Sequence, residues 1–466
     1  MSKPIVYPYI PNSVPEEKQK LLKEIGIDSV EDIFKEIPDH LRFKGKMNIP
    51  EPFLSEYELR RHVEGLLAKN KNCKDYINFL GAGTWQHYVP SVVDEIISRD
   101  EFLTAYVVGD AQGDHGKWQA LFESASMIGE MVGMEAVNKP TYDWANAIAI
   151  ACRMAARMTG RREIFVAGTI SPGRLSVVKN YCKPEIKVEL LKYDKETGLL
   201  DLTDLKARIS SNTGAVYFEN PSYLGFIETQ GEEIAKIAHD NGAELIVGVD
   251  PSSLGILAAP ADYGADLVVG DYQPLGLHMQ WGGGLAGFVC SRDDKRYVAE
   301  YPGLLYGITT SVKEGEYCFG EVFFERTSYA SREKGKDFIG TTTALWGIAA
   351  GVYMALMGPQ GFRDLGEGIM QRVAYAKGLL AKIKGVKVDV IKSPVFKEFV
   401  VNFDDTGMTV GQINKALLDH KIFGGKDISQ EFPEYGQSAL YCITEVHTRE
   451  DLKKLATALE QIVKGL

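Results

Sequence analysis

An acidic residue at the end of an apolar run is the first feature of this sequence that points to chemistry. Asp250 directly follows the β-rich run 245–249, and a second apolar run, 265–269, leads into the polar segment 271–276. Short apolar runs bounded by Gly, Pro and Asp are typical of buried parallel strands, whose carboxyl ends carry the ligand sites of open α/β sheets. An Asp at one strand end and a polar loop after the next strand is the layout of a pyridoxal phosphate (PLP) site.

The sequence lacks the amine that such a site requires. In PLP enzymes the Asp keeps the pyridine nitrogen protonated, and a Lys in the later loop forms a Schiff base with the aldehyde. No lysine occurs between Lys236 and Lys295, and Gln273-Pro274 stands where the amine would be needed. We therefore expect the architecture of a PLP enzyme that cannot anchor the cofactor covalently, with Asp250 as the remnant of a lost site.

The elements around these residues alternate between strand and helix. Strands are predicted at 163–167, 186–191, 215–219, 245–249, 267–269 and 287–290. Helices are predicted at 173–181, 202–208 and 232–240. This alternation predicts a mostly parallel sheet covered by helices, an α/β class.

Three domains are predicted along the chain. Residues 1–52 form an N-terminal arm, residues 53–345 a large domain, and residues 346–466 a smaller α+β domain. The smaller domain is predicted to contain helices at 361–383, 410–419 and 449–463 and strands at 386–391, 398–403 and 439–443. The aromatic, proline-bearing arm is expected to strap over the domain's own surface or over a partner subunit.

Composition excludes several classes of function. The 466 residues are 45% hydrophobic and carry a net charge of −11, which argues against nucleic acid or an anionic membrane as the main partner. The six cysteines show no CxxC spacing, which predicts reduced thiols of a cytosolic protein and no metal site. No apolar run reaches the roughly 18 residues of a membrane span.

Five loops carry candidate contacts to a substrate or cofactor. The Gly-rich segment 79–90 contains His87, and the segment 104–117 ends in a Gly-Asp-His-Gly-Lys sequence at a helix start. Free amides at such a helix start can bind an anion. The third and fourth loops are the segments 142–146 and 273–278. The candidates in these four loops are His87, Tyr106, Asp114, His115, Lys117, Tyr142, Asn146, Gln273 and His278. For each loop a simple turn, a solvated loop or a helix cap is the alternative.

The fifth loop is basic and ends in three threonines. Residues 331–336 contain Arg332, Lys334 and Lys336, and Thr341, Thr342 and Thr343 precede a predicted helix. A basic loop that closes on hydroxyl groups at a helix start can hold a phosphate group. The alternative is that a threonine only caps the helix.

With these residues in view, the chain resembles the glycine cleavage system P-proteins, the decarboxylating glycine dehydrogenases, and in particular their N-terminal-type subunit. The resemblance spans nearly the full length. It rests on Phe79-Leu80-Gly81-Ala82-Gly83, His87-Tyr88-Val89-Pro90, Ser98-Arg99 with Phe102, Thr104-Ala105-Tyr106, Gln119-Ala120-Leu121-Phe122-Glu123, Gly264-Ala265-Asp266, Gln273-Pro274-Leu275-Gly276, Arg332-Glu333-Lys334 and Thr444-Glu445.

The resemblance implies a fold, a cofactor and partners. The fold is that of the PLP-dependent transferases of fold type I, the aspartate-aminotransferase-like class. This subunit type has no catalytic lysine, so PLP is held covalently by a Lys-bearing partner subunit, and Thr341, Thr342 and Thr343 would be cross-subunit contacts to its phosphate. The implied activity is decarboxylation of glycine, with a lipoyl carrier protein (H-protein) as a further partner and a homodimer or an α2β2 assembly as the oligomer.

The sequence departs from the family pattern in its loops. The family's T-P-Y-Q-P-E-V-S-Q-G is replaced by residues 107–116, its Y-D-G-A-T by Tyr142-Asp143-Trp144-Ala145-Asn146, and its S-N-I-C-T-N-Q-A-L by residues 337–345. Because binding residues lie on loops, another amino acid or amine is an alternative substrate. A non-catalytic pseudoenzyme that stabilises or regulates its partner is a second alternative. An independent PLP enzyme that uses a distant lysine, Lys117 or Lys334, is a third.

Overall fold

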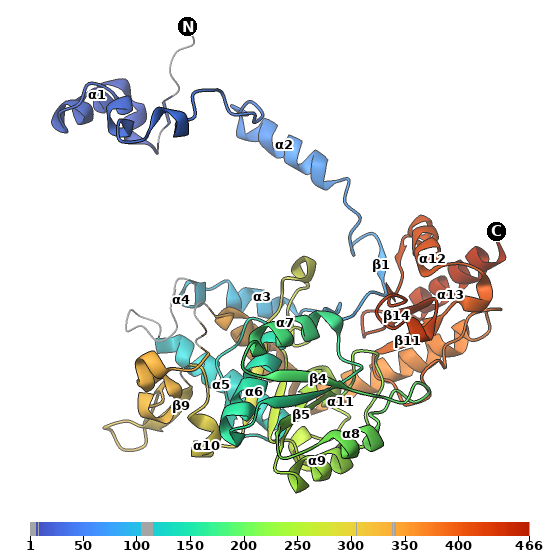
Figure 1. Ribbon diagram of the computed structural model, residues 1–466. Helices are drawn as coiled ribbons and strands as arrows, with labels where there is room; N and C mark the ends of the chain where they lie inside the picture. The colour runs from blue at the N-terminus through green and yellow to red at the C-terminus, as the bar shows by residue number, and fades with distance from the viewer. Residues whose placement is uncertain are drawn as a thin grey trace. The chain divides into compact units, whose positions relative to one another are not determined.

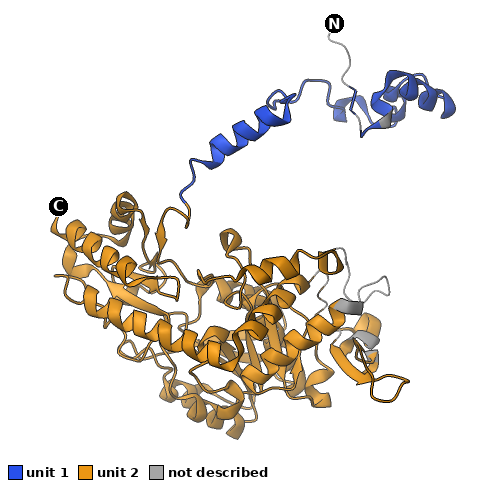
Figure 2. Ribbon diagram, turned by 180° about the vertical axis from the view of Figure 1, so that it is seen from behind, with its two compact units in different colours: residues 1–71 blue, residues 72–466 orange. Residues whose placement is uncertain are grey.

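The computed structural model describes residues 6–7, 9–103, 115–303, 305–337, 339 and 342–465. The chain divides into two compact units, Met1–Lys71 and Asn72–Leu466 (Figure 2). No helix among the described residues is long and apolar enough to cross a membrane. The domain boundaries predicted after residues 52 and 345 stay predictions.

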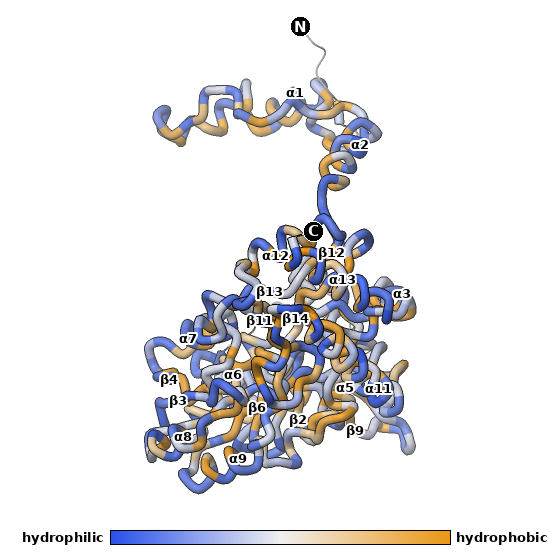
Figure 3. Tube along the Cα trace, turned by 90° about the vertical axis from the view of Figure 1, so that its right-hand side faces the viewer, coloured by the Kyte–Doolittle hydropathy of each residue, from blue (hydrophilic) through white to orange (hydrophobic). Residues whose placement is uncertain are grey.

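The first unit is a set of short helices with almost no core. It contains the 3₁₀ helices η1 (Pro11–Ser13), η2 (Val30–Phe34) and η3 (Asp39–Leu41) and the α-helices α1 (Pro15–Glu24) and α2 (Glu56–Leu67). Leu22 is buried, whereas Tyr9, Leu54 and Tyr57 are exposed over more than two thirds of their surface. Apolar residues recur along both α-helices (Figure 3).

The second unit is built on a seven-stranded sheet with the order β2-β8-β7-β6-β5-β3-β4. Its strands β4 and β5 are labelled in Figure 1. Within this sheet β8 alone runs in the direction opposite to the other six strands, so the predicted mostly parallel sheet is confirmed. The strands are β2 (Ala136–Val137), β3 (Glu163–Ala167), β4 (Lys187–Leu191), β5 (Thr213–Glu219), β6 (Glu244–Val249), β7 (Leu267–Asp271) and β8 (Gly287–Ser291).

The central strands are apolar on both faces because helices cover both. Every residue of β5, β6 and β8 is buried. Successive side chains of a strand point to opposite faces, so Leu245 and Val247 belong to one core and Ile246 belongs to another. The covering and flanking helices are α3 (Ser91–Ile97), α4 (Asp100–Leu103), α5 (His115–Val132), α6 (Trp144–Thr159), α7 (Pro172–Cys182), α8 (Leu202–Arg208), α9 (Gly231–Asp240) and α10 (Lys295–Val298).

A smaller sheet lies in the C-terminal part, after the long helix α11 (Ala344–Leu380). This helix is interrupted at Gly358, which precedes Pro359 and has the non-helical angles φ 58° and ψ 178°. The small sheet has the antiparallel order β11-β14-β13. Its elements and their neighbours are β11 (Glu398–Asn402), α12 (Val410–Leu417), β12 (Ile422–Phe423), β13 (Lys426–Asp427), β14 (Ser438–Cys442) and α13 (Arg449–Lys464).

One predicted strand is absent among the described residues. Residues 386–391 meet β11 only through the isolated bridge between Lys387 and Asn402. The alternation that suggested the strand is real, because Val386 and Val388 are buried. The backbone nevertheless leaves the sheet, since Lys392 N–H donates to the Glu196 carbonyl.

Several short elements were not predicted. The hairpin of β9 (Tyr306–Thr310) and β10 (Tyr317–Glu321) forms its own two-stranded sheet, and β1 (Ile77–Asn78) pairs with β12. Three-residue to seven-residue 3₁₀ helices occupy several loops, namely η4 (Pro251–Ser253), η5 (Pro260–Tyr263), η6 (Gln280–Gly282), η7 (Phe324–Arg326), η8 (Ser328–Lys334), η9 (Asp404–Thr406), η10 (Leu418–His420) and η11 (Pro433–Tyr435). The two-residue strands β1 and β12 and the single turns leave too little periodicity for sequence patterns to detect.

Gly225 allows the loop after β5 to touch the start of β11. Its φ is +89°, and a Cβ atom there would lie 2.0 Å from the carbonyl oxygen of Glu398. We expect Gly225→Ala to lower the free energy of unfolding by more than about 3 kcal/mol, because the clash is with backbone. Gly407→Ala is the matched control: its φ of +71° is similar, but no atom lies within 4 Å of the added Cβ.

Urea unfolding of the full chain measures both substitutions. The control should lower the free energy of unfolding by about 1–2 kcal/mol, the usual penalty for a residue with a side chain in the left-handed region. Equal losses in the two variants would mean that close packing of this loop on β11 does not constrain the fold.

Candidate functional site

The candidate site lies at the carboxyl ends of β6 and β7, where Asp250 and Asp271 stand. The Asp250 carboxylate accepts hydrogen bonds from the Ser252 amide at 3.0 Å and from the Ser252 hydroxyl at 2.7 Å. Its second oxygen lies 2.6 Å from Nζ of Lys397, the residue before β11. Both carboxylate oxygens of Asp250 therefore already bind groups of this chain.

Lys397 is a buried cation whose donors are all used. It is 2% exposed, and its Nζ lies 3.0 Å from His87 Nε2 and 3.3 Å from Ser252 Oγ, in addition to Asp250. An ammonium group has three N–H donors, and these three acceptors satisfy them. The Trp85 ring centroid lies 3.8 Å away, which adds a cation–π contact.

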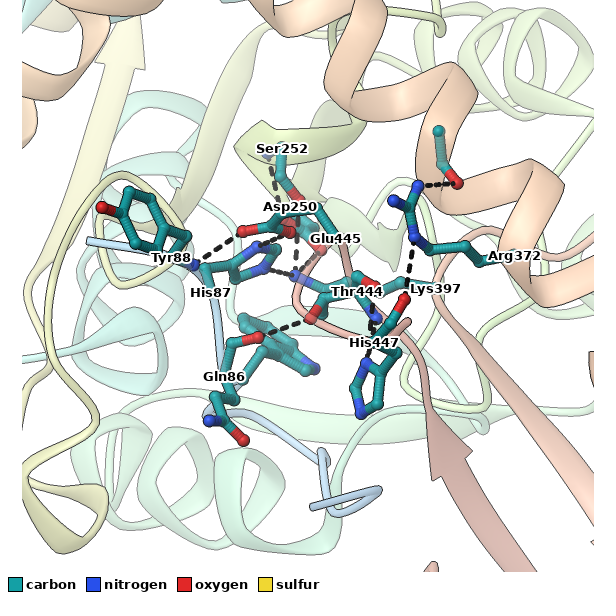
Figure 4. Close-up of polar contacts among 12 residues, drawn as sticks. Gln86, His87, Tyr88, Asp250, Ser252, Arg372, Lys397, Thr444, Glu445 and His447 are labelled. Atoms are coloured by element: carbon teal, nitrogen blue, oxygen red, sulfur yellow. Dashed lines mark hydrogen bonds and ion pairs between the residues drawn. The ribbon is translucent and has the colours of Figure 1, made fainter. Parts of the chain in front are cut away.

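His87 links this cation to a second carboxylate (Figure 4). Its Nδ1 lies 2.8 Å from Glu445 Oε2, and the Tyr88 amide donates to Glu445 Oε1 at 2.7 Å. Because Lys397 donates to Nε2, the ring carries its proton on Nδ1 and donates it to Glu445. Burial works against the Glu445 charge, but the interaction with His87 and the Tyr88 hydrogen bond outweigh it and lower its pKa to about 2.

The segment after β14 is fixed to the segment before α3 by further hydrogen bonds. Thr444 Oγ1 donates to the Gln86 carbonyl at 2.6 Å, and His447 Nε2 donates to the Asn78 carbonyl at 2.8 Å. Arg372 Nε donates to the His447 carbonyl at 3.0 Å. These bonds hold Glu445 in place beside His87.

A third carboxyl group, Glu398, lies next to Lys397 in the chain. It accepts a hydrogen bond from the Ala82 amide at 2.6 Å and is 5% exposed. Burial raises the pKa of Glu398 to about 7. The start of β11 therefore contributes both a cation and a carboxyl group of shifted acidity to the same buried region.

Two carboxylates accept hydrogen bonds from backbone amides at the start of α6. Asp143 accepts from the Asn146 amide at 2.7 Å, and Asp271 accepts from the Trp144 amide at 3.1 Å and from the Gln273 amide at 2.9 Å. Burial raises the pKa of Asp271 to about 7. Free amides at this helix start could have bound a phosphate, but these aspartates accept from the Trp144 and Asn146 amides and would repel one.

Aromatic and basic side chains fill the space between these groups. The Arg174 guanidinium stacks 3.7 Å from the Trp144 ring centroid and binds Glu219 at 3.0 Å. Together with Trp85, Tyr223, Phe396 and Lys397 they leave a cavity of about 10 Å³ beside Asp250. Such a volume holds one water molecule at most.

These residues do not fit a PLP molecule in this chain's own site. Lys397 occupies the carboxylate that would bind the pyridine nitrogen, aspartates cap the helix that would bind the phosphate, and the cavity is far smaller than the ring. Gln273, at the position that lacks a lysine, instead exchanges hydrogen bonds with the backbone of Trp85 at 3.0 and 2.8 Å. Asp250 and Gln273, which sequence analysis associated with a cofactor, are thus bound to other groups of this chain.

The structure brings together only some of the predicted contact residues. His87 and Gln273 lie in the buried network around Trp85 and Lys397. Tyr142 and Asn146 lie at the start of α6, and Thr343 Oγ1 donates to the Thr141 carbonyl beside them at 2.7 Å.

The remaining predicted residues lie elsewhere or are not described. His278 pairs with Asp94 at 3.0 Å in a partly exposed position, and Lys117 is buried in α5. Tyr106, Asp114 and Thr341 lie outside the described residues, as does the side chain of His115, and Thr342 is partly buried. A substrate or cofactor role for each of these residues stays a prediction.

Sequence analysis missed the residues that complete the network. Lys397 and Glu445 come from the small C-terminal part, far along the chain from Asp250. The lysine beside Asp250 is thus neither Lys117 nor Lys334. The one available signal was a charged pair, Lys397-Glu398, placed between apolar residues at the start of a predicted strand.

The depressed pKa of Glu445 predicts how its contribution depends on pH. Its pKa falls from 4.5 to about 2, so the carboxylate stabilises the fold above about pH 4.5, and this stabilisation is lost as the pH falls towards 2. We expect Glu445→Gln to lower the free energy of unfolding by about 3 kcal/mol at pH 7, with the deficit shrinking below pH 4.5. Glu450→Gln, at an exposed position, is the control. Chemical unfolding from pH 7 to pH 3.5 measures both; a deficit that does not change with pH would contradict this role.

The full length of the chain is similar to known proteins. Residues 8–459 match the family model of the glycine cleavage system P-protein. A probable glycine dehydrogenase (decarboxylating) subunit 1 from Staphylothermus marinus is 39% identical over 99% of both chains. A protein of the same description from Pyrococcus abyssi is 38% identical over 98% of this chain and 99% of its own.

Solved structures agree with these relatives. The crystal structure of glycine decarboxylase (P-protein) of the glycine cleavage system, in inhibitor-bound form, superposes with a TM-score of 0.85 at 32% identity, covering 98% of this chain and 100% of the other. A cysteine desulfurase from Thermococcus onnurineus has a TM-score of 0.61 at 20% identity over 84% of this chain and 96% of its own, a likeness of fold alone. The predicted fold type I architecture is confirmed, and the chain belongs to the glycine cleavage system P-protein family.

Proposed function

We propose that this chain is the non-lysine-bearing subunit of a PLP-dependent glycine decarboxylase and acts together with a Lys-bearing homologous subunit. PLP is held covalently by that partner and not by this chain. The observation that carries the proposal is the replacement of a cofactor site by the ion pair of Lys397 and Asp250, 2.6 Å apart. A P-protein subunit built in this way needs a partner to supply the cofactor, and we expect it to be inactive alone.

In the proposed pair, PLP on the partner subunit would supply the electron sink that decarboxylation of glycine requires. The aminomethyl group would then pass to the lipoyl arm of a carrier protein. This chain would contribute loops to the rim of the partner's site. Among them is the segment before α11, where Thr341, Thr342 and Thr343 would lie against the cofactor phosphate. The single hydroxyl hydrogen of Thr343 is donated to the Thr141 carbonyl, so the hydroxyl of Thr342 is the one tested below as a donor to the phosphate.

Two features of the described residues support that role for the threonine segment. Asp337, just before it, binds Arg153 and Arg157 of α6 at 2.5 and 2.6 Å. Thr343 is bonded to the Thr141 carbonyl directly before the same helix. The segment is therefore anchored on both sides, which suits a loop that must present hydroxyl groups in a fixed place.

A different amino acid or amine is the second candidate substrate. Trp144 stands where the family has glycine and fills the space beside Arg174, and residues 107–116 depart from the family pattern. These changes concern loops, where substrate preference is set. In a third candidate function the chain only stabilises or regulates its partner.

Co-expression with a Lys-bearing P-protein homologue tests the proposal. We expect a hetero-oligomer that exchanges labelled bicarbonate into the carboxyl group of glycine, whereas either subunit alone should exchange at background rate. Exchange with another amino acid but not with glycine would support the second candidate. A chain that remains self-associated, or a partner fully active without it, would contradict the proposed function.

The threonine segment gives a separate prediction. Thr342→Val should weaken PLP binding by the pair about tenfold or more, because a lost hydrogen bond to a charged group costs about 1.5–3 kcal/mol. PLP titration of the pair by cofactor absorbance measures this, with Thr409→Val, a cap of the distant helix α12, as the control. Unchanged affinity in the Thr342→Val variant would contradict a hydrogen bond from Thr342 to the cofactor phosphate.

A further inference from the structure

The buried charges around Lys397 form a contact between separate parts of the second unit. Lys397 directly precedes β11 and Glu445 follows β14, so both adjoin strands of the small sheet. Asp250 follows β6 of the large sheet, and His87 lies in the segment before α3. Each hydrogen bond or ion pair from Lys397 to Asp250 or His87 therefore connects the small sheet to another element.

We propose that Lys397 acts as a permanent internal cation in the place of a cofactor and locks the small C-terminal sheet onto the end of β6 without any bound ligand. Three observations carry this inference: the complete use of the ammonium donors, the burial of both charges, and the lack of space for a competing group. The lock is a property of this chain alone and does not depend on the proposed function.

The first observation is that every N–H donor of the Lys397 ammonium group has an acceptor. Lys397 has one acceptor on each of three residues, at 2.6, 3.0 and 3.3 Å, and an aromatic face at 3.8 Å. A buried ammonium is retained only where such acceptors replace its lost water. The three acceptors and the aromatic face therefore favour a cation at this position, and they fix the backbone of Lys397.

The second observation concerns mutual dependence. The side chains of Lys397 and Asp250 are 2% and 6% exposed. Removing one partner leaves the other as an uncompensated buried charge, whereas replacing both removes the charge problem altogether. His87 extends the dependence to Glu445, because its Nδ1–H must point to that carboxylate for Nε2 to accept from Lys397.

The third observation concerns closure. Beside the lock, the Phe396 amide donates to the Gly225 carbonyl at 3.1 Å and the Ile227 amide donates to the Pro394 carbonyl at 2.8 Å. With a residual cavity of about 10 Å³, no group larger than water separates the small sheet from the end of β6. The closed arrangement is therefore complete with this chain's own atoms.

Hydrogen–deuterium exchange of the full chain tests the lock. Lys397→Met and Asp250→Asn should each reduce the protection of β11 and β14 by about 100-fold or more, the factor expected when a buried charge loses its partner. Protection of β3 and β4, on the far edge of the large sheet, should change much less. The double variant should recover most of the lost protection, because neither charge remains.

Lys392→Met is the matched control. Lys392 lies five residues before Lys397 and forms an ion pair of the same 2.6 Å length with Glu196, but both side chains are more than 60% exposed. Its loss should leave exchange in β11 and β14 unchanged, because exposed pairs contribute little.

Each result of these exchange measurements either supports or contradicts the proposed lock. Single variants that match the control, or a double variant that loses the sum of both single losses, would overturn the lock. If a single variant fails to fold, the double variant becomes the decisive measurement: its recovery of a folded, protected small sheet supports the lock, and its failure to fold refutes it.

Discussion

The ion pair between Lys397 and Asp250 is the constraint on which the site depends. Both groups are buried, so removal of either would leave the other without its partner of opposite charge. Asp250 is positioned by β6 and by its hydrogen bonds to Ser252, and Lys397 by the start of β11. The large sheet, the small sheet and the segment around His87 must all be in place for this one contact to form.

The surrounding residues follow from that constraint. Glu445 orients His87 so that its free nitrogen faces the cation, and Trp85 covers it with an aromatic face. Trp144 and Arg174 fill the remaining volume. A P-protein fold thereby keeps the framework of a cofactor enzyme while its polar groups satisfy each other, which agrees with a subunit that completes a site on another chain.

Much of the fold could be predicted from the sequence because its signals are local. The run 163–167 and the helix 202–208 were predicted with the bounds that β3 and α8 have, and Asp250 was correctly placed at a strand end. The partner of Asp250 could not be predicted, because Lys397 meets it only through tertiary packing. The strand predicted at 386–391 was wrong for the related reason that burial alternates there without a neighbouring strand to bond. Contact roles for residues such as Tyr142 and Thr342 stay predictions.

Direct measurement of PLP binding by the purified full chain, without its partner, tests the central claim best. The chain would be titrated with PLP, reduced with borohydride and digested, and its peptides searched for a pyridoxyl group on lysine. The account predicts no saturable binding and no modified peptide at one group per chain. Saturable binding with stoichiometric modification of Lys397, or of any other lysine of this chain, would contradict it.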